Sequence, residues 1–310
     1  MSVKDLYEIV DGIRDFELHG ESSPREAFPY TEEVNGKLTS FEFENATYGN
    51  VFCCENLDLM IDLVEKGYEE RFQMIYLDPP FYSKAKYFLR RKDGSREEAY
   101  SDLWPEGFKE YLKMITERLV ITRRLLSEDG LIWVHLDYRA VHYVKVIMDE
   151  IFGHRNFVNE IIWGYRSGGA GSRRFARKHD SILVYGKSEN YKFSPQKEKS
   201  YNRGFAPYKF KGVEEFRDEK GWYTLVNMRD VWDIPMVGRT SAERTGYATQ
   251  KPEELLRRAV AASTEKDDLC GDFFAGSGTL GAVCKSMGRN FVLCDEQEEA
   301  YKIMCRRLSD

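Results

Sequence analysis

Short apolar runs alternate along this chain with segments of helical period, and this alternation constrains the fold more than any other feature. Residues 72–77 (FQMIYL) and 131–136 (LIWVHL) are apolar almost throughout, as strands buried on both faces are. Between them, residues 108–126 place apolar side chains at the spacing of a helix with one buried face. Strands that alternate with helices predict an α/β fold with a doubly wound, mostly parallel sheet.

The alternation is interrupted once, and the interruption defines the expected domain organisation. The interrupting segment is basic and aromatic, and the strand–helix pattern returns after it. The first 45 residues resemble a short helix followed by an irregular arm. We therefore predict an N-terminal arm at 1–45, a core formed by 46–187 and 247–310, and a small insertion at 188–246.

Composition excludes several classes of protein. The chain has no run of 18 apolar residues and its N-terminus is too acidic for a secretory signal, so we expect a cytoplasmic protein without a membrane span. Its six cysteines form no C-x-x-C pair, which predicts reduced thiols and no metal site. The net charge is −6, yet residues 161–220 hold 14 Lys and Arg against 7 Asp and Glu. Such a region attracts a polyanion, although a solvated loop shows the same charge.

A tetrapeptide of chemical interest follows the first apolar run. Proline restricts the residue before it to extended geometry, so Asp78-Pro79-Pro80-Phe81 leaves the strand as a stiff segment. The Asp78 carboxylate and the Pro79 carbonyl are then two acceptors beside the flat ring of Phe81. A base with an exocyclic amino group fits these features, since the acceptors would orient its N–H groups and the ring would stack on an extruded base. A strand-ending turn would use the same residues.

A glycine-rich turn forms the second motif. Residues 272–278 (DFFAGSG) join an expected strand to an expected helix, where glycines let the backbone approach a ligand. Asp295 follows the next strand, 17 residues beyond Gly278, near the distance at which an acidic side chain binds ribose hydroxyls. The turn lacks the full dinucleotide fingerprint, which favours S-adenosylmethionine over NAD as the ligand.

Together and in this order, the two motifs resemble the β group of S-adenosylmethionine-dependent amino-methyltransferases, which includes many bacterial DNA methyltransferases. In that group the catalytic Asp-Pro-Pro-aromatic motif precedes the Phe-x-Gly-x-Gly motif, and this chain has DPPF at 78–81 and FAGSG at 274–278. The segments DVWDIP (230–235) and TQKP (249–252) are also typical of the group. The resemblance covers residues 46–310 and implies a Rossmann-like methyltransferase fold in circularly permuted order.

The resemblance also implies roles for individual residues. The expected catalytic pocket consists of Asp78, Pro79, Pro80 and Phe81. The expected S-adenosylmethionine site consists of Glu55, Thr249, Lys251, Asp272, Phe274, Ala275, Gly276, Ser277, Gly278 and Asp295. Within it, the turn lines the methionine end, Asp295 binds the ribose, and Thr249 and Lys251 close over the carboxylate. Glu55 departs from the Asp that is usual in the family, and the extra methylene leaves its contact with the cofactor adenine open.

Basic and aromatic side chains interleave in residues 166–220, a pattern that binds phosphates and stacks bases. In the context of the family, double-stranded DNA is the expected partner. The expected DNA-binding residues are Arg166, Arg173, Arg174, Arg177 and Lys178. A homodimer and a separate restriction endonuclease are further partners that the family context allows, since the chain carries no endonuclease motif.

The implied function is site-specific methylation of a flipped DNA base at its exocyclic amino group. Asp at the first position of the catalytic motif accompanies adenine more often than cytosine in the family, which favours adenine N6. Methylation of cytosine N4 stays open, because that amino group is chemically equivalent. Methylation of structured RNA and a non-catalytic, DNA-binding modification subunit also stay open, and a turnover assay decides between them.

Overall fold

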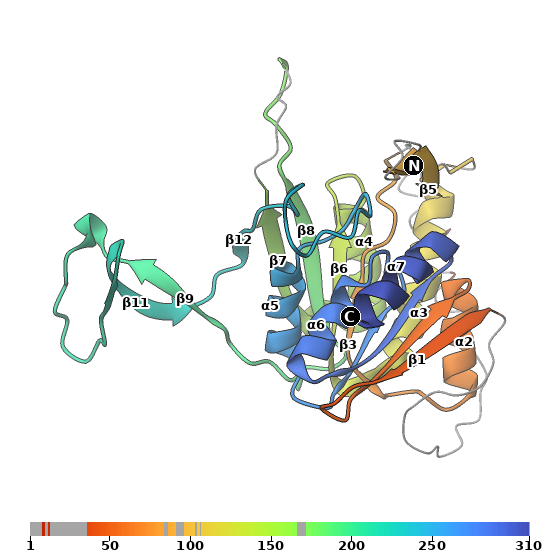
Figure 1. Cartoon of the computed structure of the whole chain (residues 1–310), viewed down its shortest axis with the longest axis horizontal. Coiled ribbons are helices and arrows are strands. Elements are labelled where there is room, and N and C mark those ends of the chain that lie inside the picture. Colours follow the sequence, from red (N-terminus) through yellow and green to blue (C-terminus); the bar gives the residue numbers. More distant parts are fainter. Residues whose placement is uncertain are drawn as a thin grey trace.

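The computed structural model describes residues 8–9, 12, 36–83, 86–90, 96–102, 104–105, 107–165 and 172–309. A nine-stranded sheet forms its centre (Figure 1), and its strands lie side by side in the order β1 (Lys37–Glu42), β2 (Tyr48–Cys53), β14 (Asn290–Asp295), β13 (Leu269–Asp272), β3 (Phe72–Leu77), β6 (Leu126–Leu136), β8 (His179–Gly186), β7 (Phe157–Gly164) and β12 (Val231–Asp233). The five strands from β2 to β6 in this order are parallel. The predicted α/β fold with a mostly parallel sheet is confirmed.

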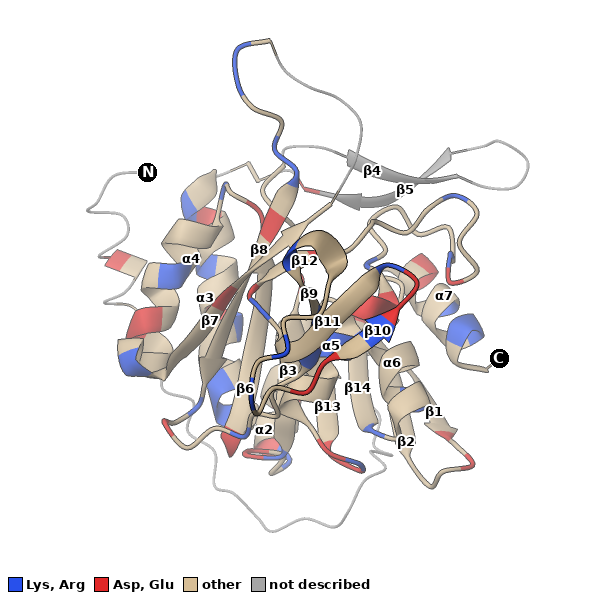
Figure 2. Cartoon of the chain, turned by 90° about the vertical axis from the view of Figure 1, so that its left-hand side faces the viewer, with Lys and Arg blue, Asp and Glu red and all other residues tan. Residues whose placement is uncertain are grey.

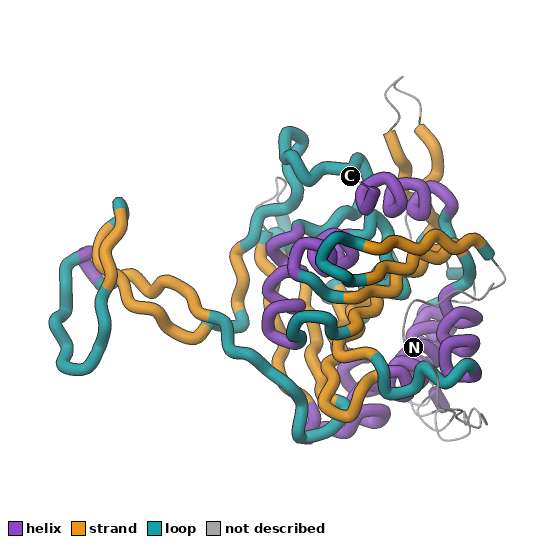
Figure 3. The backbone as a smooth tube through the Cα atoms, turned by 60° about the horizontal axis from the view of Figure 1, so that its bottom comes forward, coloured by secondary structure: helices purple, strands orange, loops and turns teal. Residues whose placement is uncertain are grey.

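Helices cover both faces of the sheet (Figures 1 and 3). One face carries α2 (Asn56–Glu65), α3 (Phe108–Leu125) and α4 (Val141–Met148), and the other carries α5 (Glu253–Ser263), α6 (Thr279–Met287) and α7 (Glu298–Ser309). Each helix turns its apolar side toward the strands, so the molecule has one apolar core on each face of the sheet. In the ranges given above, no helix has the length and apolar character needed to cross a membrane.

The central strand β3 shows how the sequence divides its side chains between the two cores. All of its residues are buried. Ile75 and Leu77 belong to the core under α2 and α3, whereas Met74 and Tyr76 belong to the core under α5 and α6. Successive side chains of a strand point to opposite faces, and a strand in a doubly covered sheet is therefore apolar throughout.

The chain leaves the neighbouring strands β3 and β13 in opposite directions. From β3 it continues through α3 to β6 on one side, and from β13 it continues through α6 to β14 on the other. The loops at the carboxyl ends of the two strands therefore diverge, and ligands bind in the crevice that opens at such a switch point. Asp78 follows β3 and the glycine-rich turn follows β13, so both sequence motifs lie at this crevice.

A smaller antiparallel sheet projects from the main body (Figures 1 and 3). It consists of β9 (Lys197–Tyr201), β10 (Phe216–Asp218) and β11 (Gly221–Asn227). We call residues 197–227 the lobe. The lobe lies inside the segment 188–246 that we expected to be an insertion, whereas β12, from the same segment, pairs with β7 in the main sheet. A two-stranded hairpin of β4 (Lys86–Arg90) and β5 (Arg96–Ser101) follows the tetrapeptide, and the sequence pattern did not indicate it.

Candidate active site

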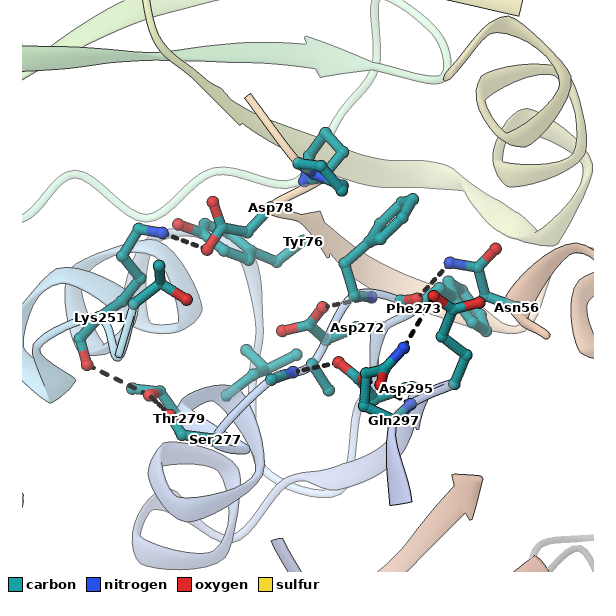
Figure 4. Close-up of a pocket in the computed structure, with 18 of the residues that line it drawn as sticks. Asn56, Tyr76, Asp78, Lys251, Asp272, Phe273, Ser277, Thr279, Asp295 and Gln297 are labelled. Carbon is teal, nitrogen blue, oxygen red and sulfur yellow. Dashed lines mark hydrogen bonds and ion pairs between the residues drawn. The ribbon is translucent and has the colours of Figure 1, made fainter. Parts of the chain in front are cut away.

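A cavity of about 280 Å³ opens where the loops after β3 and β13 diverge. The residues that we expected in the catalytic pocket and the cofactor site line this cavity, with the exception of Gly278 (Figure 4). The lining residues from the two expected sets are Glu55, Asp78, Pro79, Pro80, Phe81, Thr249, Lys251, Asp272, Phe274, Ala275, Gly276, Ser277 and Asp295. The fold thus brings together side chains from five separate segments of the chain at one edge of the sheet.

Asp78 is the first residue after β3, and its two carboxylate oxygens have different surroundings. Oδ2 forms an ion pair with Nζ of Lys251, and both side chains are mostly buried, with 16% and 12% of their surface exposed. Oδ1 is buried and has no hydrogen-bond partner among the described residues. A buried acceptor without a donor is costly. The carboxylate therefore leaves one acceptor position for a donor on a ligand.

Lys251 is a cation in the cavity wall. Its ammonium nitrogen lies 5.1 Å from the centre of the Phe81 ring, in addition to its ion pair with Asp78. Its backbone carbonyl accepts a hydrogen bond of 3.2 Å from the hydroxyl of Thr279, at the start of α6. This backbone contact ties the segment before α5 to the turn after β13 (Figure 4).

The two glycines of the turn have different structural roles. Gly276 lines the cavity with φ at +51°, and a Cβ atom there would lie 3.0 Å from the ring of Tyr247, another lining residue. Gly278 lies outside the cavity wall and caps α6 in the left-handed conformation. A Cβ atom on Gly278 would lie 2.9 Å from the side chain of Met304, on α7. Gly276 thus keeps the cavity open, whereas Gly278 permits close packing behind it.

Two carboxylates lie behind the turn, Asp272 buried and Asp295 half-buried. Asp295 accepts hydrogen bonds of 2.9 Å from the backbone N–H groups of Gly276 and Gln297, and burial raises its pKa to about 6. Asp272 accepts a hydrogen bond of 3.0 Å from the backbone N–H of Phe274, and burial raises its pKa well above the usual range. These bonds fix the path of the turn, and they place an acidic wall on one side of the cavity.

Arg118, on α3, is a residue that the sequence reasoning missed. It is buried, and its guanidinium group forms an ion pair with Glu55 and donates a hydrogen bond of 2.6 Å to the side chain of Asn56. Asn56 in turn donates a hydrogen bond of 2.7 Å to the backbone carbonyl of Phe273, in the turn. Arg118 therefore connects α3 to the start of α2 and, through Asn56, to the turn after β13. The signal in the sequence was an arginine on the apolar side of the expected helix.

His135, on β6, is the second residue that the sequence reasoning missed. The four histidines considered showed no common partner and were interpreted as structural or solvated. The structure places His135 in the core, with Nδ1 at 2.6 Å from the Tyr76 hydroxyl and Nε2 at 3.3 Å from Oδ2 of Asp180. Nδ1 also lies 3.9 Å from Oδ1 of Asp78. A polar residue inside the apolar run 131–136 was the available signal, since a buried imidazole needs partners.

The expected DNA-binding residues lie outside the cavity. Arg166 falls outside the described residues. Arg173, Arg174 and Arg177 are exposed and Lys178 is half-buried, all in the segment that leads into β8. Figure 2 shows basic residues along this segment where it rises beyond the sheet. The guanidinium carbon of Arg177 lies 3.8 Å from the centre of the Tyr138 ring, which follows β6. β8 is antiparallel to β6, so β8 begins beside the carboxyl end of β6. The arginines before β8 therefore lie at the same end of the strands as the cavity.

The doubly wound sheet, with a carboxylate at the end of one central strand and a glycine-rich turn at the end of its neighbour, defines a Rossmann-like methyltransferase. The model of a family described as DNA methylase, N6_N4_Mtase, matches residues 72–306. The chain belongs to this family of amino-methyltransferases. Membership identifies S-adenosylmethionine as its cofactor.

The sequence identity to individual relatives is low. The chain is 26% identical over 254 residues to the type II methyltransferase M.HinfI of Haemophilus influenzae, and the alignment covers 78% of this chain and 64% of that protein. It is 28% identical over 247 residues to the type II methyltransferase M.HpaI of Haemophilus parainfluenzae, and that alignment covers 77% of this chain and 69% of that protein. The chain thus spans a little under two thirds of the length of M.HinfI.

Solved structures share the fold at low identity. The cytosine-N4-specific PvuII DNA methyltransferase superposes with a TM-score of 0.59 at 17% identity, over 84% of this chain and 86% of that one. The complex of M1.HpyAVI with S-adenosylmethionine superposes with a TM-score of 0.54 at 18% identity, over 84% and 98%. These likenesses support the Rossmann-like architecture that the sequence predicted.

The cavity fits the chemistry of S-adenosylmethionine. The cofactor carries a sulfonium cation, a ribose with two hydroxyl donors and an amino acid end with both charges. Acidic side chains at the ends of β2, β3, β13 and β14 surround the cavity and favour a cation. Lys251 supplies a positive charge for a carboxylate, and Gly276 leaves room for close approach to the backbone.

Proposed function

We propose that this chain methylates the exocyclic amino group of a flipped DNA base, and that the base is adenine. One observation carries the proposal. The buried Oδ1 of Asp78, without a hydrogen-bond partner among the described residues, lies at the edge of the cavity that fits S-adenosylmethionine. An exocyclic amino group offers the N–H donor that this oxygen lacks.

The tetrapeptide supplies the remaining contacts to the base. Asp78 and the carbonyl of Pro79 would each accept one N–H of the amino group and orient its lone pair across the cavity. Phe81 lines the same cavity and offers its ring for stacking. An aromatic amino nitrogen is a poor nucleophile because its lone pair is delocalised into the ring. Two strong acceptors favour its pyramidal form and so expose the lone pair.

The opposite wall holds the methyl donor. When bound, S-adenosylmethionine supplies an electrophilic methyl group on a sulfonium. The side chains that line the cavity then orient the cofactor. Asp295 binds the ribose hydroxyls, Lys251 and Thr249 face the carboxylate, and the turn around Gly276 lines the methionine end. Glu55, held by Arg118, faces the adenine end.

DNA engagement is assigned to the segment before β8 and to the lobe. The arginines at 173, 174 and 177 would contact phosphates, and the Phe175 side chain between them is 97% exposed. The lobe carries exposed aromatic side chains, among them Phe205 and Phe210, and would contact the duplex beyond the target base. The insertion 188–246 is thus our candidate for target recognition. A cytoplasmic location, where DNA is accessible, belongs to the same proposal.

Adenine is preferred over cytosine on two grounds. Asp78 is a stronger acceptor than the serine that often accompanies cytosine in the family. The Phe81 ring also stacks over a larger area on a purine than on a pyrimidine. The second candidate, cytosine N4, is favoured by the likeness in fold to the cytosine-N4-specific PvuII enzyme. Both candidates require the same acceptors, so the choice of base leaves the mechanism unchanged.

A methyl-transfer assay with the wild type and one variant tests the enzyme class. Purified chain is incubated with methyl-labelled S-adenosylmethionine and with unmethylated duplex DNA, single-stranded DNA or RNA. We expect label in duplex DNA, and we expect Asp78→Asn to lower its rate by roughly a hundredfold or more. Cofactor affinity, measured by calorimetry, should change little in the variant. Label in RNA and none in DNA would contradict the proposal, as would wild-type activity in Asp78→Asn.

A further inference from the structure

A buried histidine stands directly behind the carboxylate that binds the base. His135 is fully buried on β6, beside β3 in the sheet. Its Nδ1 lies 3.9 Å from Oδ1 of Asp78, the oxygen without a partner among the described residues. The rings of His135 and Phe81 have centroids 5.6 Å apart. Base binding by Asp78, Pro79 and Phe81 makes no use of this imidazole.

Two hydrogen bonds determine which nitrogen of His135 carries the hydrogen. Burial raises the pKa of Tyr76 well above the usual range, so its hydroxyl keeps its proton and donates to Nδ1 over 2.6 Å. Nε2 then carries the hydrogen and donates to Oδ2 of Asp180 over 3.3 Å. In this tautomer Nδ1 is a base, and it is the ring nitrogen that lies near Asp78.

We propose that His135, held by Asp180, is a positioning residue that takes from Asp78 the proton released by the methylated amino group. The inference rests on the proposed function, because Asp78 must accept that proton first. When the nitrogen lone pair forms the new N–C bond, the bond from the methyl carbon to the sulfonium sulfur would break with its electron pair left on sulfur, and the nitrogen becomes positively charged. One N–H bond then breaks, its electron pair stays on nitrogen, and the proton binds Oδ1 of Asp78. The proton moves on to Nδ1 of His135, and Asp78 returns to the carboxylate form.

The geometry permits this second step. A separation of 3.9 Å exceeds a hydrogen bond, and a shift of roughly 1 Å brings the two atoms into range. In the structure the Tyr76 hydroxyl donates a hydrogen bond to Nδ1. A hydroxyl can rotate and accept a hydrogen bond instead of donating one. Once Nδ1 is protonated, it donates to the Tyr76 oxygen. Asp180 meanwhile keeps its hydrogen bond from Nε2.

Charged and polar groups surround the ring. Two carboxylates, from β3 and β8, face the imidazole, and one ammonium group pairs with the first of them. Burial acts to raise the pKa of Asp180, but its hydrogen bond with His135 holds the pKa below the usual range. A hydrogen bond of 3.2 Å from Tyr165 reaches the other oxygen of Asp180. The titratable or charged groups around His135 are Tyr76, Asp78, Tyr165, Asp180 and Lys251.

Timing of proton release tests the proposal. In a single turnover on DNA, methyl transfer is followed by chemical quench and proton release by an indicator dye in weak buffer. In the wild type we expect the proton in solution after methyl transfer, because His135 holds it. In His135→Gln we expect release in step with transfer, and transfer slowed by about ten- to a hundredfold.

Two further variants separate proton transfer from packing. Asp180→Asn should change the release timing in the same direction, and it keeps the inference testable where His135→Gln fails to fold. Trp163→Phe is the packing control, because that ring lies edge-on to His135 at 5.4 Å between centroids and carries no titrating group. It should retain the delayed release of the proton. Calorimetric binding of S-adenosylmethionine checks that each variant is folded.

The outcomes distinguish this inference from the proposed function. If the wild type methylates DNA and His135→Gln retains the delayed release of the proton, the role of His135 is overturned and the function stands. If the wild type transfers no methyl group to DNA, the proposed function itself fails. Identical timing in Trp163→Phe and His135→Gln would assign the effect to packing and overturn the inference.

Discussion

Lys251 and Asp78 are 173 residues apart in sequence and meet in one mostly buried ion pair at the cavity. The pair joins the segment before α5, which holds the lysine, to the end of β3, which the aspartate follows. A mostly buried pair matters chiefly through the cost of removing one partner, because the other charge is then left uncompensated.

A double-mutant cycle measures this coupling. We expect Lys251→Met to lower the free energy of unfolding by up to about 3 kcal/mol, because the Asp78 carboxylate loses its countercharge. Asp78→Asn in the same background should recover part of the loss, giving a coupling energy of at least about 1 kcal/mol. Denaturant titration of the four proteins provides the values. Additive effects would show that the ion pair contributes nothing to stability.

The two glycines of the turn should fail in different ways when replaced. Gly276→Ala places a Cβ atom 3.0 Å from Tyr247 in the cavity wall, so we expect cofactor affinity to fall about tenfold, or about 1.4 kcal/mol. Gly278→Ala places its Cβ atom 2.9 Å from Met304, away from the cavity, and should act mainly on the melting temperature. Calorimetry and thermal unfolding of both variants make the comparison. Equal loss of affinity in both would contradict the distinction.

Cofactor affinity should depend on pH through Asp295. Burial raises the pKa of this carboxyl to about 6, so the ionised form that accepts ribose hydroxyls is present above that pH and is lost as the pH falls through it. Below pH 6 we expect affinity to decrease by about tenfold per pH unit, as for one proton. Asp295→Asn should bind weakly at every pH and lack this decrease. Asp272→Asn is the matched variant, and loss of the pH dependence there would assign the titration to Asp272.

The basic segment before β8 should bind phosphates. Replacing Arg173 and Arg174 by Ala should weaken DNA binding and reduce the salt dependence of log K by about one per lost contact. The control pair is Arg123 and Arg155, which are also exposed but lie at the opposite edge of the sheet. Their replacement should leave the slope unchanged. A wild-type slope in the Arg173/Arg174 variant would show that these arginines are only solvated.

The fold was readable from the sequence where burial imposes a pattern. The run 72–77 became β3 with the same bounds, because a strand covered on both faces is apolar at nearly every position. The lobe was less readable. Its strands are half exposed, as in β9 (KEKSY), and so they show no clean alternation of apolar and polar residues. The sequence identified that segment by its composition and not by its structure.

The cavity shows the same division between local motif and tertiary contact. The tetrapeptide and the glycine-rich turn are contiguous, so their residue types and spacing predicted both. Arg118 and His135 act through partners that are far away in the sequence. Arg118 bonds to Asn56, which is 62 residues away, and His135 bonds to Tyr76, which is 59 residues away. A single polar residue on an apolar element signals that a buried partner exists, and only the folded chain shows which one.

The identity of the methylated nucleoside tests the central claim most directly. Unmethylated genomic DNA is incubated with the protein and S-adenosylmethionine, digested to nucleosides and analysed by mass spectrometry. We predict N6-methyladenine, at a level that falls with Asp78→Asn. N4-methylcytosine alone would overturn the choice of base and leave the acceptor mechanism in place. The absence of any methylated amino group, with the protein folded and cofactor bound, would contradict the account.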